Sequence, residues 1–326
     1  MKVLLLGSGA VGARAVRQLV EADEITDVIV AGGRDAARAD VVTGGGEKAR
    51  DGGDGRDVGP VDAVLLAGPR GTHGPMAEEQ LAQGRAVVSC SDDVDDVRRL
   101  LALDAEAKAR GVSVVIGAGF SPGYTCLLAR HAANRFDTVD EIHVARSGTG
   151  GPACARQHHR ARSRTALDWR DGGWQRRPGG SGRELCWFPD PIGAEDCYRA
   201  ELPDALLLVP AFPGVGRVTA RLAASRSDRL TAQLPMLRKP HPEGLVGAVR
   251  VEVRGRRGTA QDVLVLGALD RPAVAAGAVA ALATRWAVDG RVPAGAAGLA
   301  ALVDPVPFLR ELAGVGIKAA IFEGWS

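Results

Sequence analysis

The start of the chain places a buried strand, a glycine-rich turn and an amphipathic helix in direct succession. Lys2–Leu6 is an apolar run after one lysine, Gly7–Gly12 reads G-S-G-A-V-G, and apolar residues recur with a helical period over Val11–Val20. In such a turn the first glycine permits the sharp bend, the second lets the backbone approach a pyrophosphate, and the third lets the helix pack closely on the strand. The helix N-terminus also offers free N–H groups to phosphates, so the pattern predicts a dinucleotide site. The residues expected to contact the cofactor here are Gly7, Gly9, Ala10, Val11 and Gly12.

Short apolar runs alternate with helical patterns as far as residue 119. The predicted strands are Lys2–Leu6, Asp27–Ala31, Asp62–Ala67, Ala86–Ser89 and Val112–Ile116. The predicted helices are Val11–Val20, Arg34–Val42, His73–Gln83 and Val94–Ala109. Because the apolar runs do not alternate in polarity, they indicate an α/β fold with a Rossmann-type doubly wound parallel sheet. No convincing strand pattern lies between Val42 and Val61, so this stretch is either a flexible loop, which we prefer, or a degenerate third strand.

Aromatic residues divide the chain into two unlike parts. The first Phe, Trp or Tyr is Phe120, and the length of 326 residues suits one large or two ordinary domains. We expect a dinucleotide-binding domain over residues 1–120, joined by the tail 290–326, and an α+β substrate and dimerisation domain over 121–289. The elements expected after Phe120 are helices Pro122–Asn134, Val215–Ala224 and Pro272–Ala287, strands Glu141–Arg146 and Ala205–Val209, an antiparallel pair Val246–Arg254 and Gln261–Leu269, and two short helices in Gly295–Gly324.

The end of the second strand favours NADP over NAD. An NAD site usually has an acidic residue there for the ribose hydroxyls, but this chain has Gly32 and Gly33, followed by Arg34. A guanidinium can bind a 2′-phosphate that a carboxylate would repel. Asp35 keeps NAD possible, since a shift of one or two residues would bring it to the ribose.

Three further loops follow predicted parallel strands and are rich in small residues. In a doubly wound sheet the nicotinamide lies over the carboxyl ends of the strands, so these loops are expected to meet it. Their candidate cofactor contacts are Gly68, Pro69, Ser91 and Gly119. We interpret His73, just after the first of these loops, as structural.

Composition excludes several other classes of protein. The net charge of +2 gives no global field that would attract a nucleic acid. The five cysteines show no C-x-x-C spacing, which argues against a disulfide framework or a zinc site and favours free thiols in a reducing compartment. The apolar run at the N-terminus is too short for a signal peptide, and no run is long enough to span a membrane. We therefore expect a soluble, cytoplasmic protein with neither a membrane nor a nucleic acid as partner.

The motifs together resemble the saccharopine dehydrogenase family, whose relatives include lysine 6-dehydrogenase and carboxynorspermidine dehydrogenase. The resemblance rests on the opening fingerprint, on the Gly-Arg after the second strand, and on the loop Gly117–Gly123, which ends in Pro-Gly and leads into a helix. The tail Pro293–Glu323, with Gly316-Ile317 near its end, is similar to family tails that fold back on the nucleotide domain. The resemblance implies hydride transfer at a carbon–nitrogen bond.

Charged and aromatic residues crowd into the start of the second half. Eight arginines lie within residues 156–183, and they are typical of a solvated basic face, of an anionic-substrate site or, less well, of nucleic-acid binding. His158 and His159 lie in this run, and neighbouring arginines favour a neutral imidazole that can act as a base. Adjacent histidines on a helix diverge and no third ligand has suitable spacing, so we expect no metal site.

The remaining candidates come from the tyrosines and the segment Arg183–Gly193, which we expect at the mouth of a substrate pocket. Tyr198 can donate a proton, and with His158 it is our catalytic candidate. The expected substrate-binding residues are Tyr124, Arg183, His159 and Asp196. Arg183 would hold a substrate carboxylate.

The sequence thus predicts an NADP(H)-dependent oxidoreductase that transfers a hydride at the C–N bond of an amino-acid-like or opine-like small molecule. The alternatives are an NADP-dependent reductase of a simple carbonyl and a non-catalytic NADP(H)-binding redox sensor. A methyltransferase is a distant further alternative, because the acidic residue that usually ends its second strand is missing. The strands near 246–269 could offer an edge for a homodimer.

Overall fold

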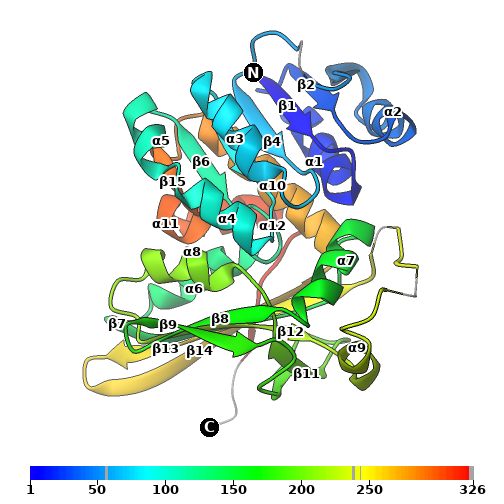
Figure 1. Ribbon diagram of the computed structural model, residues 1–326. Coiled ribbons are helices and arrows are strands. Elements are labelled where there is room, and N and C mark those ends of the chain that lie inside the picture. Colours follow the sequence, from blue (N-terminus) through cyan, green and yellow to red (C-terminus); the bar gives the residue numbers. More distant parts are fainter. Residues whose placement is uncertain (56–57, 237–238, 243, 323–326) are drawn as a thin grey trace. The chain divides into compact units, whose positions relative to one another are not determined.

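The computed structural model describes residues 1–55, 58–236, 239–242 and 244–322, and its contacts group the chain into two compact units. The first unit comprises Met1–Gly119 and Ala273–Val303, and the second comprises Phe120–Pro272 and Asp304–Ser326. Figure 1 shows the elements of each. This division differs from the expected domains in two segments, since residues 273–289 group with the first unit and residues 304–326 with the second.

The first unit is built on a seven-stranded parallel sheet, which confirms the predicted fold class. Its strands are β1 (Lys2–Leu6), β2 (Asp27–Ala31), β3 (Ala49–Asp51), β4 (Ala63–Leu66), β5 (Ala86–Ser89), β6 (Ser113–Ile116) and β15 (Gly295–Gly298). Their order is β15-β6-β5-β4-β1-β2-β3. After β1 the chain adds β2 and β3 on one side, and it then returns to add β4, β5 and β6 on the other side, so the strand order reverses between β1 and β4. β1, β4, β5 and β6 are almost wholly buried, as the unbroken apolar runs require.

Helices cover both faces of this sheet (Figure 1). They are α1 (Ala10–Val20), α2 (Asp35–Gly44), α3 (His73–Ala82), α4 (Val94–Leu101), α5 (Asp104–Arg110), α10 (Pro272–Val288), α11 (Leu299–Leu302) and a 3₁₀ turn (Gly46–Lys48). Helix α10 packs against α1 at Gly277, where an added Cβ would lie 2.5 Å from the Cβ of Arg14. This close approach explains why α10 groups with the first unit. Among the described residues, no helix has the length and apolarity needed to cross a bilayer.

Two edge strands of this sheet escaped prediction. The expected loop after Val42 contains β3, which pairs in parallel with β2 and buries only Ala49. At the opposite edge β15 reads Gly-Ala-Ala-Gly and pairs in parallel with β6. Neither segment contains an apolar run, so neither gives a strand signal in the sequence. These edge strands are positioned by backbone pairing with the neighbouring strand and not by their own side chains.

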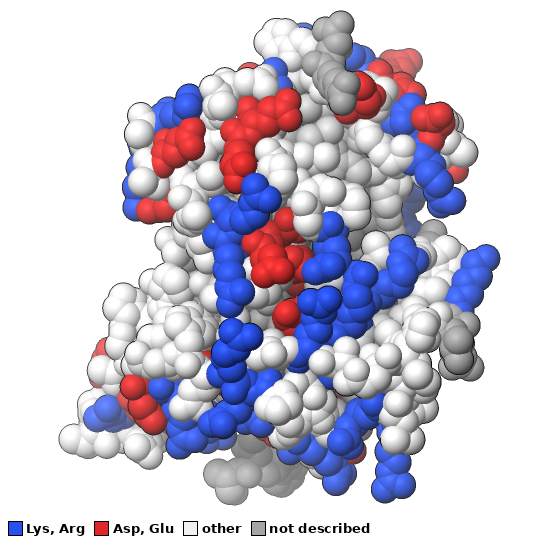
Figure 2. All heavy atoms as spheres, viewed as in Figure 1, with Lys and Arg blue, Asp and Glu red and all other residues white. Residues whose placement is uncertain are grey.

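The second unit is built on a mixed nine-stranded sheet. Its strands are β7 (Thr138–Ser147), β8 (Thr165–Arg170), β9 (Gly173–Pro178), β10 (Glu184–Trp187), β11 (Ala194–Arg199), β12 (Arg217–Ala223), β13 (Gly247–Arg257), β14 (Ala260–Asp270) and β16 (Ala320–Phe322). Their order is β10-β11-β12-β7-β13-β14-β16, with β8 and β9 attached to β12. The helices of this unit are α6 (Tyr124–Ala133), α7 (Pro152–Ala161), α8 (Asp204–Ala211), α9 (Arg226–Leu230) and α12 (Pro305–Gly314). Figure 2 shows Lys and Arg side chains gathered over the part of this unit that carries α7.

Two expectations for the second unit were wrong. Ala205–Val209, expected as a strand, lies in α8, and Val215–Ala224, expected as a helix, contains β12. A short apolar run such as A-L-L-L-V fits a buried helix as well as a strand. In β12, Arg217 and Arg221 are spaced as on one face of a helix, yet Arg221 is buried and pairs with Glu184 at 2.6 Å. The predicted antiparallel pair was correct and is β13 with β14, although β16 covers part of the outer edge of β14.

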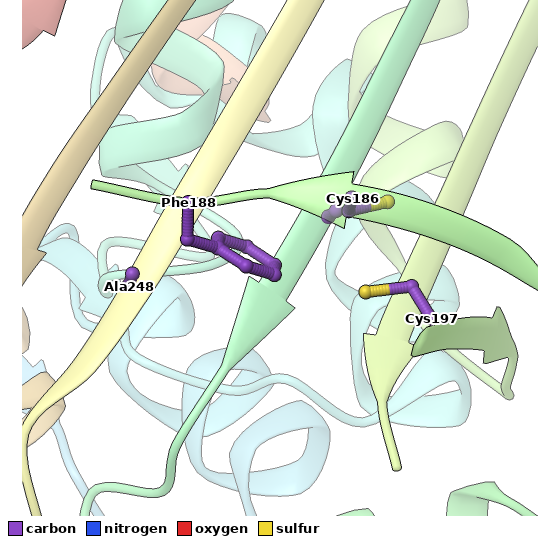
Figure 3. Packing of buried hydrophobic residues seen from close by; sticks show 5 residues of the cluster. Cys186, Phe188, Cys197 and Ala248 are labelled. Carbon is purple, nitrogen blue, oxygen red and sulfur yellow. The ribbon is translucent and has the colours of Figure 1, made fainter. Parts of the chain in front are cut away.

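A small apolar cluster fixes the end of this sheet that contains β10. Figure 3 shows Phe188 lying across the strands beside Ala248, with Cys186 and Cys197 on the paired strands β10 and β11. All five cysteines are free, and these two are buried. The hydrogen bond from Cys197 lowers the pKa of Cys186, while the same contact and burial raise the pKa of Cys197.

A buried polar network holds the loop that ends in Pro-Gly. The hydroxyls of Ser121 and Thr125 donate to Oδ1 of Asp204 at 2.9 and 3.2 Å, and Nη1 of Arg146 donates to the carbonyl of Ser121. Asp204 is fully buried, and its Oδ2 has no hydrogen-bond partner in the described part of the chain. Burial raises the pKa of this carboxyl, against the opposing charge of Arg146. The loop is therefore fixed by contacts with α8 and β7, far away in the sequence.

Asp204 gives a pH dependence whose sign can be tested. Its folded pKa is raised above the ordinary value of 3.8, so it favours the folded state below that pH and loses this contribution as the pH rises through the raised pKa. The stability of the unchanged protein relative to Asp204→Asn should therefore fall as the pH rises. Thermal unfolding of both proteins across a pH series measures this difference.

Asp262→Asn is the control with the opposite sign. Arg257 and the N–H of Val263 lower the pKa of Asp262, so its contribution is present at neutral pH and is lost as the pH falls. The same trend with pH for both variants would contradict the raised pKa of Asp204.

Candidate functional site

The turn between β1 and α1 uses its three glycines for different reasons. Gly7 has φ +127°, and an added Cβ would lie 2.5 Å from the carbonyl carbon of Ala67. A Cβ on Gly12 would lie 2.0 Å from the carbonyl oxygen of Gly7. By contrast, a Cβ on Gly9 would meet nothing within 4 Å. The fold therefore requires glycine at Gly7 and Gly12, whereas at Gly9 the protein leaves open space beside the backbone.

That open space lies at the N-terminus of α1. The helix begins at Ala10, its N-cap Gly9 supplies no side-chain acceptor, and its first turn contains no acidic residue. The N–H groups at this end are therefore not capped by a side chain of the N-cap residue, and the helix dipole favours an anion there. A pyrophosphate fits both the open space and the donors.

The turn after β2 lies against this glycine turn. A Cβ on Gly33 would lie 2.2 Å from Oγ of Ser8, which itself donates to the carbonyl of Gly32 at 3.4 Å. Arg34 follows as the exposed N-cap of α2. Asp35, the residue that kept NAD possible, forms an ion pair of 2.9 Å with Arg38. A positive side chain thus follows the turn, and the nearest carboxylate is already paired.

The loops after β4 and β5 are tied together by buried polar contacts. His73 connects them, since its Nδ1 lies 2.9 Å from Oγ of Ser89 and its Nε2 lies 3.0 Å from the carbonyl of Gly68. Burial lowers the pKa of His73, which favours a neutral ring in this structural role. Oγ of Ser91 donates to Asp96 at 3.0 Å. Gly68, Pro69 and Ser91 therefore lie at the same edge of the sheet, and Gly119 follows the neighbouring strand β6.

The residues predicted to bind or act on the substrate make separate contacts within the second unit. Arg183 and Asp196 pair at 2.8 Å, on and beside the antiparallel strands β10 and β11. Tyr198 on β11 is buried, and its hydroxyl accepts a hydrogen bond from Arg229 at 3.3 Å. Tyr124 begins α6 and stacks on Phe120, and burial followed by the charge of Asp270 raises its pKa. The segment Arg183–Gly193, expected at the mouth of a substrate pocket, contains strand β10.

His158 and His159 both lie in α7 and are both buried. Nε2 of His158 lies 3.4 Å from Sγ of Cys154, one turn earlier, while Nε2 of His159 lies 2.7 Å from the carbonyl of Leu234. The two rings therefore have different partners, as the divergence of adjacent residues on a helix requires.

Several charged residues around these candidates were missed. Arg226 and Arg229 come from α9, and Arg146 and Asp204 from β7 and α8. The guanidinium of Arg229 stacks over the ring of Tyr198 at 4.3 Å, so a positive charge lies against a predicted catalytic residue. No local pattern indicates these contacts, because the partners are 31 residues apart for Arg229 and Tyr198 and 83 for Ser121 and Asp204.

Comparison with known proteins identifies the fold. No family model matches the chain, and no curated protein matches it. Among solved structures it is similar to saccharopine dehydrogenase (L-Glu forming) from Saccharomyces cerevisiae, with a TM-score of 0.70, 16% identity, and coverage of 99% of this chain and 100% of that one. It is also similar to the C. glutamicum DAP dehydrogenase in complex with DAP, with a TM-score of 0.52, 14% identity, and coverage of 97% and 99%. The chain therefore has the two-part Rossmann fold of saccharopine dehydrogenase, which confirms the structural side of the resemblance seen in the motifs.

Proposed function

We propose that this protein is an NADP(H)-dependent oxidoreductase that transfers a hydride at a C–N bond of an amino-acid-like or opine-like substrate. The observation that carries the proposal is the glycine turn, because it leaves open space at Gly9 and directs the N-terminus of α1 toward it. A bound nicotinamide dinucleotide would supply the hydride chemistry, and the protein would bind and orient the reactants.

The preference for NADP rests on the turn after β2. Gly32 and Gly33 replace the acidic residue that would hold the ribose hydroxyls, and Arg34 follows them. Asp35, the residue that would favour NAD, is exposed and forms an ion pair with Arg38. We assign Arg34 to the 2′-phosphate, and Gly68, Pro69, Ser91 and Gly119 to the edge that receives the nicotinamide.

The substrate class rests on the fold and on the Pro-Gly loop. The two structural neighbours are dehydrogenases of saccharopine and of DAP, by their names. We propose a small carboxylate-bearing substrate for this chain too, with Arg183 as carboxylate ligand and Tyr124, His159 and Asp196 as further contacts. His158 and Tyr198 are the proposed proton-transfer groups, which the formation and breakdown of a carbinolamine require.

Gly9→Ala tests the cofactor site without disturbing the fold. Gly9 has φ −81° and ψ −174°, which alanine adopts readily, and the added methyl meets no protein atom within 4 Å. We expect unchanged thermal stability but NADPH binding weakened about tenfold or more, because the methyl would occupy the space of the pyrophosphate. Fluorescence titration with NADPH measures the loss.

Gly12→Ala is the matched comparison. Its methyl would clash with the Gly7 carbonyl, so we expect lower thermal stability as well as weaker binding. If Gly9→Ala bound NADPH as tightly as the unchanged protein, the turn would not hold the pyrophosphate.

The reaction itself is tested by following NADPH oxidation against 2-oxo acids and aldehydes, each with and without an amine. We expect turnover only when carbonyl and amine are both present, and faster turnover with NADPH than with NADH. Turnover without amine would instead show a carbonyl reductase. Tight NADPH binding without oxidation by any pair would support a redox sensor.

His158→Gln and Tyr198→Phe test the proton-transfer assignment in the same assay. Loss of a general acid or base lowers kcat about 10²-fold or more. The control is Arg176→Gln, on the exposed face of β9 and outside the proposed contacts. The assignment is wrong if both variants keep kcat within a few-fold of the unchanged protein while remaining folded.

A further inference from the structure

The second unit contains a cavity of about 420 Å³ whose lining includes none of the residues assigned above to the cofactor, the substrate or proton transfer. It lies where the residues after α7, the turn after β9 and helix α9 meet. Its walls are formed by Arg162, Ser163, Gly179, Gly180, Arg226, Arg229, Leu230, Ala232 and Gln233. A volume of this size falls within the range of small-molecule pockets.

The side chains that line the cavity carry an excess of positive charge. Three of them are arginines and none is acidic. A carboxylate outside the lining, that of Asp228, has its Oδ1 3.8 Å from Nη1 of Arg162. Asp228 is already engaged in the capping box of α9, where it accepts from the N–H of Ser225 at 3.0 Å and from its hydroxyl at 2.8 Å.

The three arginines differ in their existing contacts. The Arg162 side chain is only 13% exposed, and its Nη2 donates to the carbonyl of Ala223 at 3.3 Å, whereas its Nε has no hydrogen-bond partner in the part of the chain that the structure describes. The guanidinium of Arg229 stacks over the ring of Tyr198, and its Nη1 donates to the Tyr198 hydroxyl. Its Nε and Nη2 take no part in that hydrogen bond. Arg226 is exposed and has no acidic partner among the described residues.

The opposite wall is formed by backbone. A Cβ on Gly179 would lie 2.3 Å from the carbonyl oxygen of Arg164 and 2.7 Å from that of Arg162, so only glycine fits there. Gly180 has φ +72°, which also favours glycine. The turn after β9 thereby packs directly against the backbone of Arg162, whose largely buried side chain lines the cavity.

We propose that this cavity is a binding site for a small ligand with at least two negative charges, carried by phosphate or carboxylate groups. Guanidinium groups bind both kinds of oxyanion through paired, charge-assisted hydrogen bonds, and partial burial strengthens each bond. Ser163 and Gln233 add neutral polar groups at the rim. The site lies within the second unit alone and does not depend on the proposed hydride transfer.

Isothermal titration calorimetry of the full chain, without nicotinamide cofactor, tests the site. The probes are pyrophosphate and citrate at constant ionic strength, with potassium chloride as the reference. We expect at least one probe to bind with a Kd below about 1 mM, and the stronger of the two identifies the preferred oxyanion. Absence of binding for both probes would overturn the proposal.

Substitutions locate the binding. Arg226→Gln should weaken the bound probe about tenfold or more, and so should Arg229→Gln. Arg226 is the cleaner test, because no contact within the described protein depends on its charge. Arg176→Gln, which removes the same charge from the exposed face of β9, should leave the affinity unchanged. Equal weakening by all three variants would show general charge attraction and would also overturn the site.

Discussion

The contact between the Gly7 carbonyl and the backbone of Gly12 is the constraint on which the first unit depends. The helix can follow β1 this closely only because Gly12 has no side chain, and β4 can lie beside β1 only because Gly7 has none. These two contacts aim the N-terminus of α1 at the edge of the sheet where the other loops end. The space at Gly9 is a consequence of that packing, and it is what makes the edge suitable for a phosphate-bearing cofactor.

The second unit depends on buried charge to a greater extent. Arg146 and Asp204 hold the Pro-Gly loop, Arg199 pairs with Asp168 at 2.7 Å, and Arg221 pairs with Glu184. Partly or fully buried ions are costly unless they are paired, so these contacts restrict which arrangements of the strands are possible. Within the arginine-rich segment, Arg162 has both roles: its Nη2 donates to the carbonyl of Ala223 at the end of β12, and its side chain lines a cavity.

The sequence prediction succeeded where a structure is specified by neighbouring residues and failed where it is not. The strands β1, β2, β4, β5 and β6 were all found, because each is an unbroken apolar run bounded by turn residues. β3 and β15 were missed because backbone pairing alone defines them. α8 and β12 were exchanged because a short apolar run has no period that separates helix from strand.

The same distinction between neighbouring and distant residues applies to the candidate sites. The sequence by itself determined the glycine turn between β1 and α1, the glycine-arginine pair after β2 and the point near Phe120 where the second unit begins, because turn sterics and hydrophobic periodicity act over a few residues. Only the tertiary structure decided that Asp204 fixes the Pro-Gly loop, that Arg229 covers Tyr198, and that Arg162 shares a cavity with α9. These contacts join residues separated by 31 to 83 positions, and electrostatic partners at that distance leave no local pattern.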